Sequence, residues 1–261
     1  MSQSFDELVA IMARLRGPGG CPWDHEQTHE SIVPQLIEET YEAIGAIDAK
    51  NWPHLCEEVG DLLLHLLFHS QIASETKDFT INDVVTGLTA KLVRRHPHVF
   101  GDTKVKDAGE VIKNWDKIKA GEKKNQKMES ALDNIPRALP ALMQAYKLTK
   151  KASKMGFDWE KTEDVLKKVD EEIREIKEAV KTKNQEEIAG EIGDLFFSLA
   201  NLCRFLQVPP EEALRTSNEK FRKRFGTMEK TIREQGKKME EMNLSELDSV
   251  WNQIKKSNSP L

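Results

Sequence analysis

The feature that most constrains this chain is an internal repeat of two acidic elements. Glu38-Glu39-x-x-Glu42 recurs as Glu171-Glu172-x-x-Glu175, and Glu58-x-x-Asp61 recurs as Glu191-x-x-Asp194. The same number of residues separates the two elements in both copies. Because residue identity, order and spacing all recur, the pattern indicates a tandem duplication of one module.

Three further elements recur in the same order around the acidic ones. They are Cys21-Pro22-Trp23-Asp24 with Gly156-Phe157-Asp158-Trp159, Lys91-x-x-x-Arg95 with Lys220-x-x-x-Arg224, and Trp115-x-x-Ile118-Lys119 with Trp251-x-x-Ile254-Lys255. We therefore expect two domains, residues 1–119 and 128–261, joined by a polar linker over residues 120–127.

The apolar residues of both copies follow the period of an α-helix. Phe5, Leu8, Val9, Met12 and Leu15 lie on one helical face, and strand-like alternation is almost absent from the chain. Proline and glycine interrupt this pattern often enough to leave helices of ordinary length. The sequence therefore predicts an all-α fold built from two tandem helical modules.

Composition and charge exclude several other classes of protein. The chain is 38% hydrophobic and 32% charged, and it has no apolar run of about 18 residues that would span a membrane. Acidic and basic residues are interspersed at a net charge of -5, which argues against nucleic acid as a partner. Three widely spaced cysteines give no disulfide framework, and the acidic N-terminus does not resemble a signal peptide. We expect a cytoplasmic protein.

The acidic elements have the spacing of metal ligands on helices. Carboxylates at i and i+3, such as Glu172 with Glu175 or Glu191 with Asp194, lie on nearly one line of a helix. We expect both pairs to face the core, because apolar stripes run beside them. The stripes are Val165, Val169, Ile173, Ile176 and Val180 for the first pair, and Leu195, Leu199 and Leu202 for the second.

Four converging carboxylates need a cation between them. Their mutual repulsion and the cost of burying each charge would otherwise destabilise the fold. Oxygen-only ligands favour Mg2+, or the similar Mn2+, over zinc or copper. A lone acidic pair in so charged a chain is usually a solvated helix face, but its recurrence in register favours a metal site.

The N-terminal copy carries a second candidate metal site, formed by Glu39, Glu42, Glu58 and Asp61. Its second acidic helix continues with His65 and His69, where the C-terminal copy has Ser198 and Leu202. These histidines are interpreted either as ligands of a softer metal or as hydrogen-bonded core residues, and the sequence favours the core.

Basic and aromatic residues recur near the end of each copy. Lys220 with Arg224, and Lys91 with Arg95, lie one helical turn apart and can bind phosphate oxygens or form surface ion pairs. Beside the acidic clusters, phosphate binding is the better interpretation. Trp251 and Trp115 fit equally well as packing anchors and as stacking surfaces for a nucleotide base.

These motifs together are typical of one family. They are Gly19-Gly20-Cys21-Pro22-Trp23-Asp24, the two acidic elements of each copy, Arg94-Arg95-His96-Pro97-His98-Val99-Phe100, Gly156-Phe157-Asp158-Trp159, Asn218-Glu219-Lys220-Phe221 and Arg224-Phe225. Over essentially its full length the chain resembles the MazG family of two-domain nucleoside triphosphate pyrophosphohydrolases. The resemblance implies four-helix-bundle modules made by two subunits, and therefore a homodimer. It also implies Mg2+-dependent hydrolysis of NTPs and dNTPs to monophosphate and pyrophosphate.

The resemblance also implies roles for individual residues of the C-terminal copy. Glu172, Glu175, Glu191 and Asp194 would hold Mg2+, and Lys168, Lys220 and Arg224 would neutralise the phosphates. Glu171 would orient or deprotonate the attacking water. The C-terminal domain is expected to be the main catalytic one, since the N-terminal copy has Gln35 in place of Lys168.

Two other functions remain open from the sequence. The first is a pyrophosphohydrolase with a narrower substrate range, for dUTP or a phosphoribosyl-ATP-like substrate. Such relatives share the acidic helices and differ in the pocket that binds the base. The second is a non-catalytic helical module that binds Mg2+ without turnover.

Overall fold

The computed structural model describes residues 4–122 and 130–257, and all regular structure in these two ranges is helical. This confirms the predicted all-α class. The chain divides into two compact units, unit 1 over residues 1–125 and unit 2 over residues 126–261. Within the described ranges, no helix combines the length and the apolar character needed to cross a membrane.

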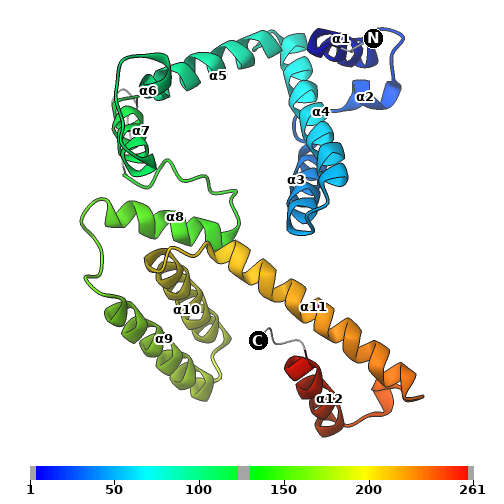
Figure 1. The fold of residues 1–261 in the computed structure, drawn as a ribbon, viewed down its shortest axis with the longest axis vertical. Coiled ribbons are helices and arrows are strands. Elements are labelled where there is room, and N and C mark those ends of the chain that lie inside the picture. Colours follow the sequence, from blue (N-terminus) through cyan, green and yellow to red (C-terminus); the bar gives the residue numbers. More distant parts are fainter. Residues whose placement is uncertain (1–3, 123–129, 258–261) are drawn as a thin grey trace. The chain divides into compact units, whose positions relative to one another are not determined.

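Unit 1 is built around an antiparallel hairpin of two long helices (Figure 1). Its helices are α1 (Phe5–Arg16), α2 (Pro22–Glu26), α3 (Val33–Asp48), α4 (Trp52–Thr76), α5 (Ile81–Arg95), α6 (Pro97–Phe100) and α7 (Ala108–Glu122). α3 packs along α4, and α1 packs near the other end of α4, where Met12, Leu67, Phe68 and Ile72 form the core with Ile32. Asn51 accepts a hydrogen bond from the His54 backbone and caps α4.

Unit 2 repeats the long hairpin and adds a second helical pair. Its elements are α8 (Ala141–Ser153), α9 (Thr162–Thr182), α10 (Gln185–Phe205), α11 (Pro210–Glu234), η1 (Met239–Glu241) and α12 (Leu244–Ser257). α10 packs against both α9 and α8, while α12 packs on the distal half of α11. Lys183 takes a left-handed conformation and Asn184 caps α10, so the α9–α10 turn needs only two residues.

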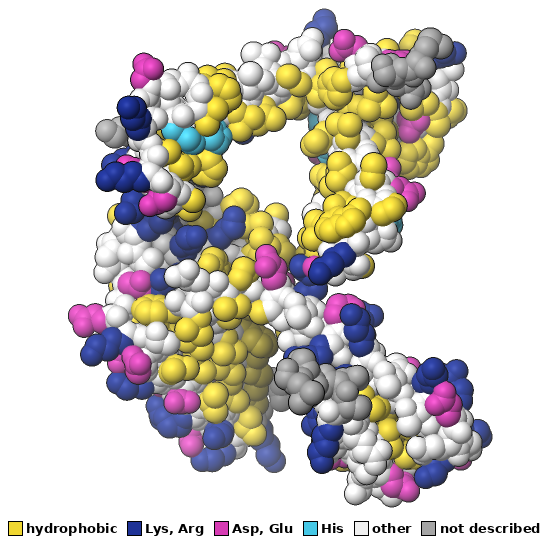
Figure 2. Space-filling view, in the orientation of Figure 1, with side chains coloured by type: hydrophobic (Ala, Val, Ile, Leu, Met, Phe, Trp, Pro, Cys, Tyr) yellow, Lys and Arg dark blue, Asp and Glu magenta, His cyan; other side chains and the backbone are white. Residues whose placement is uncertain are grey.

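Two expectations from the sequence differ from the structure. The linker expected over residues 120–127 begins inside a helix, because α7 continues to Glu122; residues 123–127 lie outside the described ranges. The buried stripe of α9 contains Val165 and Val169 as expected, whereas Ile173 and Val180 are 38% and 55% exposed. α9 packs along α10 through one line of side chains, so the rest of its apolar sector faces outward (Figure 2).

Candidate active site

The α9–α10 hairpin brings three of the predicted carboxylates of unit 2 together. One oxygen of each of Glu172, Glu175 and Glu191 lies within 4.8 Å of the other two. Glu172 is only 3% exposed, because it occupies the same buried line of α9 as Val165 and Val169. The i, i+3 spacing thus aligns two carboxylates on α9, and the antiparallel partner helix supplies the third.

The carboxylates of this cluster lie close enough together to raise one another's cost of ionisation. Burial raises the pKa of Glu191, and the charges of Glu175, Asp194 and Glu172 raise it further. Asp194 is exposed and lies outside the group of three, so the structure brings together three of the four ligands that the sequence predicts. Its charge is nevertheless close enough to act on Glu191.

Lys168 lies one helical turn before Glu172 and neutralises part of this charge. Its Nζ is 2.8 Å from a carboxylate oxygen of Glu172 and 3.1 Å from one of Glu171. The two carboxylates raise the pKa of the Lys168 ammonium well above its usual value. The predicted Lys168, Glu171 and Glu172 therefore form one contiguous group, in which Glu171 is half-exposed.

Unit 1 has a matching cluster with a different neighbour. Glu39, Glu58 and Asp61 offer oxygens within 4.8 Å of one another, while Glu42 lies outside this group. Glu58 is 3% exposed, and its Oε1 is 3.0 Å from Nδ1 of His54. Its buried Oε2 has no hydrogen-bond partner in the described part of the chain. Burial raises the pKa of Glu58, and the facing Glu39 raises it further. The second predicted site is thus also three carboxylates rather than four.

The histidines of α4 fit a core position better than a metal site. His69 Nδ1 is 2.8 Å from Nδ1 of His29, and the two rings stack. Burial and the neighbouring His29 lower the pKa of His69. His65 is 7% exposed, but no described residue forms a hydrogen bond with its buried Nδ1. His65 is therefore buried as the core interpretation expects, whereas His69 is only partly buried and makes the expected hydrogen bond.

The structure does not bring the predicted basic pairs onto the carboxylates of their own unit. Lys220 and Arg224 lie on α11, and among the described residues neither forms an ion pair with the cluster on α9 and α10. Trp251 on α12 packs against Phe221, with 5.3 Å between ring centroids. In unit 2 the acidic cluster therefore lies on α9 and α10, whereas the basic pair lies on α11 and Trp251 on α12.

In unit 1 the equivalent residues Arg95 and Trp115 make contacts between α7 and the end of α5. Arg95 pairs with Glu122 at 2.6 Å, and Trp115 contacts the ring of His96. This is the surface ion pair that the sequence left open as the alternative for a basic residue. Lys91 is exposed on α5.

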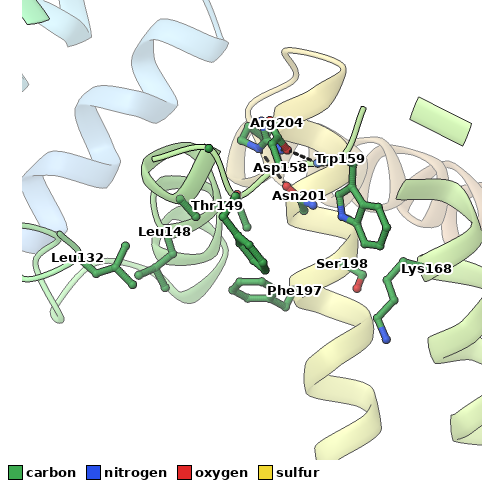
Figure 3. Close-up of a pocket in the computed structure, with 13 residues that line it drawn as sticks. Leu132, Leu148, Thr149, Asp158, Trp159, Lys168, Phe197, Ser198, Asn201 and Arg204 are labelled. Carbon is green, nitrogen blue, oxygen red and sulfur yellow. Dashed lines mark hydrogen bonds and ion pairs between the residues drawn. The ribbon is translucent and has the colours of Figure 1, made fainter. Parts of the chain in front are cut away.

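A cavity of about 660 Å³ opens beside Lys168 in unit 2. It lies between α8, α10 and the loop that precedes α9 (Figure 3). Its lining includes three aromatic side chains and several polar ones: Phe157, Trp159, Phe197, Thr149, Lys168, Ser198, Asn201 and Arg204. Gly156 turns the chain into this loop with a φ of +88° that side chains disfavour.

Sequence reasoning missed the residues of α10 that line this cavity. Ser198, Asn201 and Arg204 follow the acidic element on one side of the helix, inside an otherwise apolar run. Polar residues spaced by three in such a run could have marked them. The loop motif Gly156-Phe157-Asp158-Trp159 was found as a repeat, but its partner on α10 was not.

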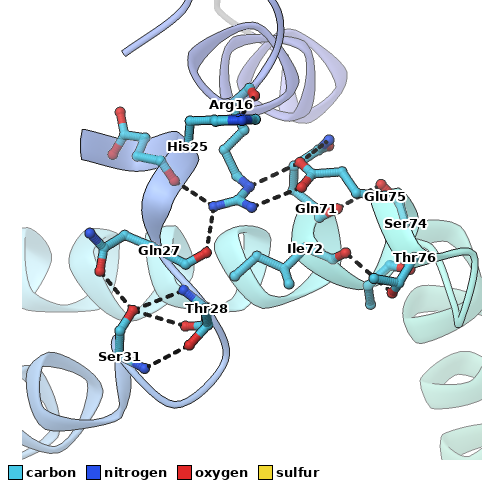
Figure 4. Close-up of polar contacts among 12 residues, drawn as sticks. Arg16, His25, Gln27, Thr28, Ser31, Gln71, Ile72, Ser74, Glu75 and Thr76 are labelled. Atoms are coloured by element: carbon cyan, nitrogen blue, oxygen red, sulfur yellow. Dashed lines mark hydrogen bonds and ion pairs between the residues drawn. The ribbon is translucent and has the colours of Figure 1, made fainter. Parts of the chain in front are cut away.

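A buried arginine holds the equivalent loop of unit 1 (Figure 4). The guanidinium of Arg16, 5% exposed, donates to both carboxylate oxygens of Glu75 at 2.9 and 2.8 Å. It also donates to the backbone carbonyls of Asp24 and Gln27. Its hydrogen bonds lower the pKa of Glu75. This contact ties the segment after α1 to the end of α4.

The fold and the clustered carboxylates define a class of all-α proteins with a helical acidic site. Two family models match the two halves: a MazG nucleotide pyrophosphohydrolase domain at residues 27–100, and phosphoribosyl-ATP pyrophosphohydrolase at residues 139–221.

Relatives align over nearly the whole chain. The nucleoside triphosphate pyrophosphohydrolase/pyrophosphatase MazG of Thermotoga maritima is 49% identical over 96% of this chain and 95% of its own length. The nucleoside triphosphate pyrophosphohydrolase of Escherichia coli K12 is 42% identical over 97% of each chain. YabN of Bacillus subtilis is 46% identical over 97% of this chain and 52% of its own length. The chain belongs to the MazG family.

Proposed function

We propose that this chain hydrolyses nucleoside and deoxynucleoside triphosphates to nucleoside monophosphate and pyrophosphate at the carboxylate cluster of unit 2. The observation that carries the proposal is the convergence of Glu172, Glu175 and Glu191 beside Lys168. Relatives named for this activity align with nearly the whole chain, which supports it. The catalytic domain of this chain would be residues 128–261. The enzyme would act in the cytoplasm, where it would remove unwanted nucleotides from the nucleotide pool.

The donor set of the cluster fits Mg2+ or Mn2+. Burial and neighbouring charges raise the pKa of Glu191, so a divalent cation between these groups would relieve an unfavourable arrangement. Its ligands would be Glu172, Glu175 and Glu191, with Asp194 at the edge. All are carboxylates, which suits a hard cation. The bound ion would supply positive charge to the phosphate oxygens.

Lys168 and Glu171 would act directly on substrate and water. Lys168 is held between Glu171 and Glu172, and its ammonium adds a second positive charge for the phosphates. Water attacks the α-phosphorus, and the bond to the bridging oxygen breaks so that pyrophosphate leaves. Glu171 is exposed enough to meet that water and accept its proton. Positioning and charge neutralisation carry most of such a reaction.

The active form would be a homodimer in which a second copy supplies Lys220, Arg224 and Trp251. Two observations support this. The basic pair does not contact the cluster of its own chain among the described residues, and Ile173 and Val180 leave an apolar face of α9 uncovered. A hairpin of two helices buries such a face most simply against a second hairpin.

Complementation between inactive variants tests this dimer. Glu172→Gln and Lys220→Ala each remove one half of the site. A mixture refolded together should regain about a quarter of the wild-type activity, since half of the dimers then contain one intact site. A mixture as inactive as either variant would contradict a shared site. Glu172→Gln mixed with Glu175→Gln is the control, because both changes fall in the same half.

Pyrophosphate release tests the function itself. Purified protein is given a panel of NTPs and dNTPs with and without Mg2+, beside Glu172→Gln and the matched control Glu39→Gln. We expect release that needs Mg2+, is lost in Glu172→Gln and persists in Glu39→Gln. A folded protein that binds Mg2+ and releases pyrophosphate from no nucleotide would instead be a regulatory module.

A narrower substrate range is the second candidate. The match of residues 139–221 to phosphoribosyl-ATP pyrophosphohydrolase favours it, because that range holds the whole acidic cluster. Adding phosphoribosyl-ATP and dUTP to the panel separates the two. Turnover of one of them at a rate far above all other nucleotides would establish the narrower enzyme.

A further inference from the structure

The cavity beside Lys168 is the feature of unit 2 that the proposed chemistry leaves unused. Lys168 contributes both to this cavity and to the carboxylate cluster, through its contact with Glu172. A ligand whose phosphates meet the cluster would therefore extend its remaining part into the cavity. The volume of about 660 Å³ is in the range of sites for small organic molecules.

Aromatic rings give the cavity surfaces for a flat ligand. Phe157, Trp159 and Phe197 all contribute to its lining, and Trp159 and Phe197 are 46% and 44% exposed. Figure 3 shows Trp159 beside Ser198 on the Lys168 side of α10, and Phe197 on the side of Leu148. Rings with uncovered faces can stack on a nucleobase, whichever base it is.

A chain of hydrogen bonds fixes the orientation of Asn201 at the wall of the cavity. Asp158 accepts a hydrogen bond from the backbone N–H of Trp159 and binds the guanidinium of Arg204 with both oxygens. The Nε–H of Arg204 then donates to Oδ1 of Asn201 at 2.9 Å. Since an arginine can only donate, the amide oxygen must face Arg204. Among the described residues no hydrogen bond from Nδ2 of Asn201 is seen, so these hydrogens are available as donors.

We propose that this cavity binds the base of the nucleotide substrate, with Trp159 as stacking surface and Asn201 as the residue that selects bases by a carbonyl oxygen. The inference rests on the proposed function, because binding of the phosphates at the carboxylate cluster is what would bring the base to the cavity. A fixed donor favours the keto bases uracil, thymine and guanine. It disfavours adenine and cytosine, whose amino groups are donors at the corresponding position.

Binding of reaction products tests the cavity without depending on turnover. Dissociation constants are measured by calorimetry for UMP, GMP, AMP and ribose 5-phosphate, which lacks a base. We expect wild-type protein to bind UMP at least about tenfold more tightly than ribose 5-phosphate, the low end of what stacking contributes. Trp159→Ala should remove this difference, whereas the control Trp23→Ala, in the equivalent loop of unit 1, should keep it.

Asn201→Leu tests the selection of the base. It keeps the size of the side chain and removes the donor, so the preference for UMP and GMP over AMP should fall about fivefold, the effect of one hydrogen bond. Equal binding of UMP and ribose 5-phosphate by wild-type protein would overturn the base site. An unchanged preference in Asn201→Leu would overturn the role of Asn201.

The same measurements separate this inference from the proposed function. Base-dependent binding that is lost in Trp159→Ala, without pyrophosphate release from any nucleotide, would keep the cavity assignment and refute the catalytic one. Pyrophosphate release with no base-dependent binding would do the reverse. Circular dichroism of each variant shows that a lost preference does not come from unfolding.

Discussion

The carboxylate clusters of the two units share two equivalent acids, Glu172 with Glu39 and Glu191 with Glu58, and differ in the third acid and in the residues beside them. In unit 2, Glu172 contacts the permanent cation of Lys168 at 2.8 Å. In unit 1, Gln35 takes the place of that lysine, and Glu58 contacts His54, which is charged only when protonated. One oxygen of Glu58 and one of Gln35 are buried and find no hydrogen-bond partner among residues 4–122 and 130–257. The duplicated module has kept its acids and changed their surroundings.

The positions that line the cavity of unit 2 differ as well. At the same spacing from the acidic residues, unit 1 has His65 where unit 2 has Ser198, and Phe68 where unit 2 has Asn201. Both His65 and Phe68 are buried, at 7% and 4% exposure, so they fill space with larger side chains. Unit 1 thus retains the acidic residues but fills the positions that line the cavity in unit 2. This difference favours unit 2 as the catalytic one.

The largest expected effect separates the two clusters. Glu172→Gln should lower kcat by about 1,000-fold, because the cation would lose a charged ligand at the reacting phosphate. Glu39→Gln, the equivalent change in unit 1, should leave kcat within about threefold. Steady-state pyrophosphate release measures both. If Glu39→Gln proves the more damaging change, unit 1 is the catalytic one.

The second effect concerns the cation that unit 1 lacks. Lys168→Gln makes unit 2 resemble unit 1 at this position and should lower kcat/KM by about 100-fold, as for the loss of one preorganised charge. Lys168→Arg should recover part of the loss. Lys167→Gln is the matched control, since Lys167 is 76% exposed and pairs with Asp164 outside the cluster. Equal losses for both glutamine variants would remove Lys168 from the site.

The smallest effect concerns how each unit holds its loop. Unit 1 uses Arg16 with Glu75, and unit 2 uses Arg204 with Asp158. Glu75→Gln leaves the buried Arg16 without its charged partner and should lower the free energy of unfolding by about 2 kcal/mol at pH 7. Thermal or urea unfolding measures this loss, with the exposed Glu7→Gln as control.

The pH dependence of that loss has a definite sign. Arg16 lowers the pKa of Glu75 below its ordinary value of 4.5. The stabilisation is therefore fully present above pH 4.5 and is lost as the pH falls through the lowered pKa. Wild-type protein and Glu75→Gln should converge in stability at that acidic limit. A difference that stays constant down to acidic pH would show that the ion pair is not its source.

The sequence predicted well wherever local spacing decides the outcome. Helical period and breakers gave the all-α class, and the i, i+3 spacing correctly placed Glu172 and Glu175 on one side of α9, close enough to converge. Prediction failed where separate segments must meet. Ile173 lies on an outward face, and Asp194 lies outside the three converging carboxylates, because these depend on how much of each helix its neighbours cover.

The sequence by itself determined the helical class, the duplication and the acidic elements, since each follows from residue type and short spacing along one helix. Only the tertiary structure decided which acids converge, where the cavity opens and which groups line it. Asp158, Asn201 and Arg204 meet through a contact between a loop and a helix, in which Asp158 and Arg204 are 46 residues apart in sequence. Such contacts depend on packing across the fold, which no local pattern specifies.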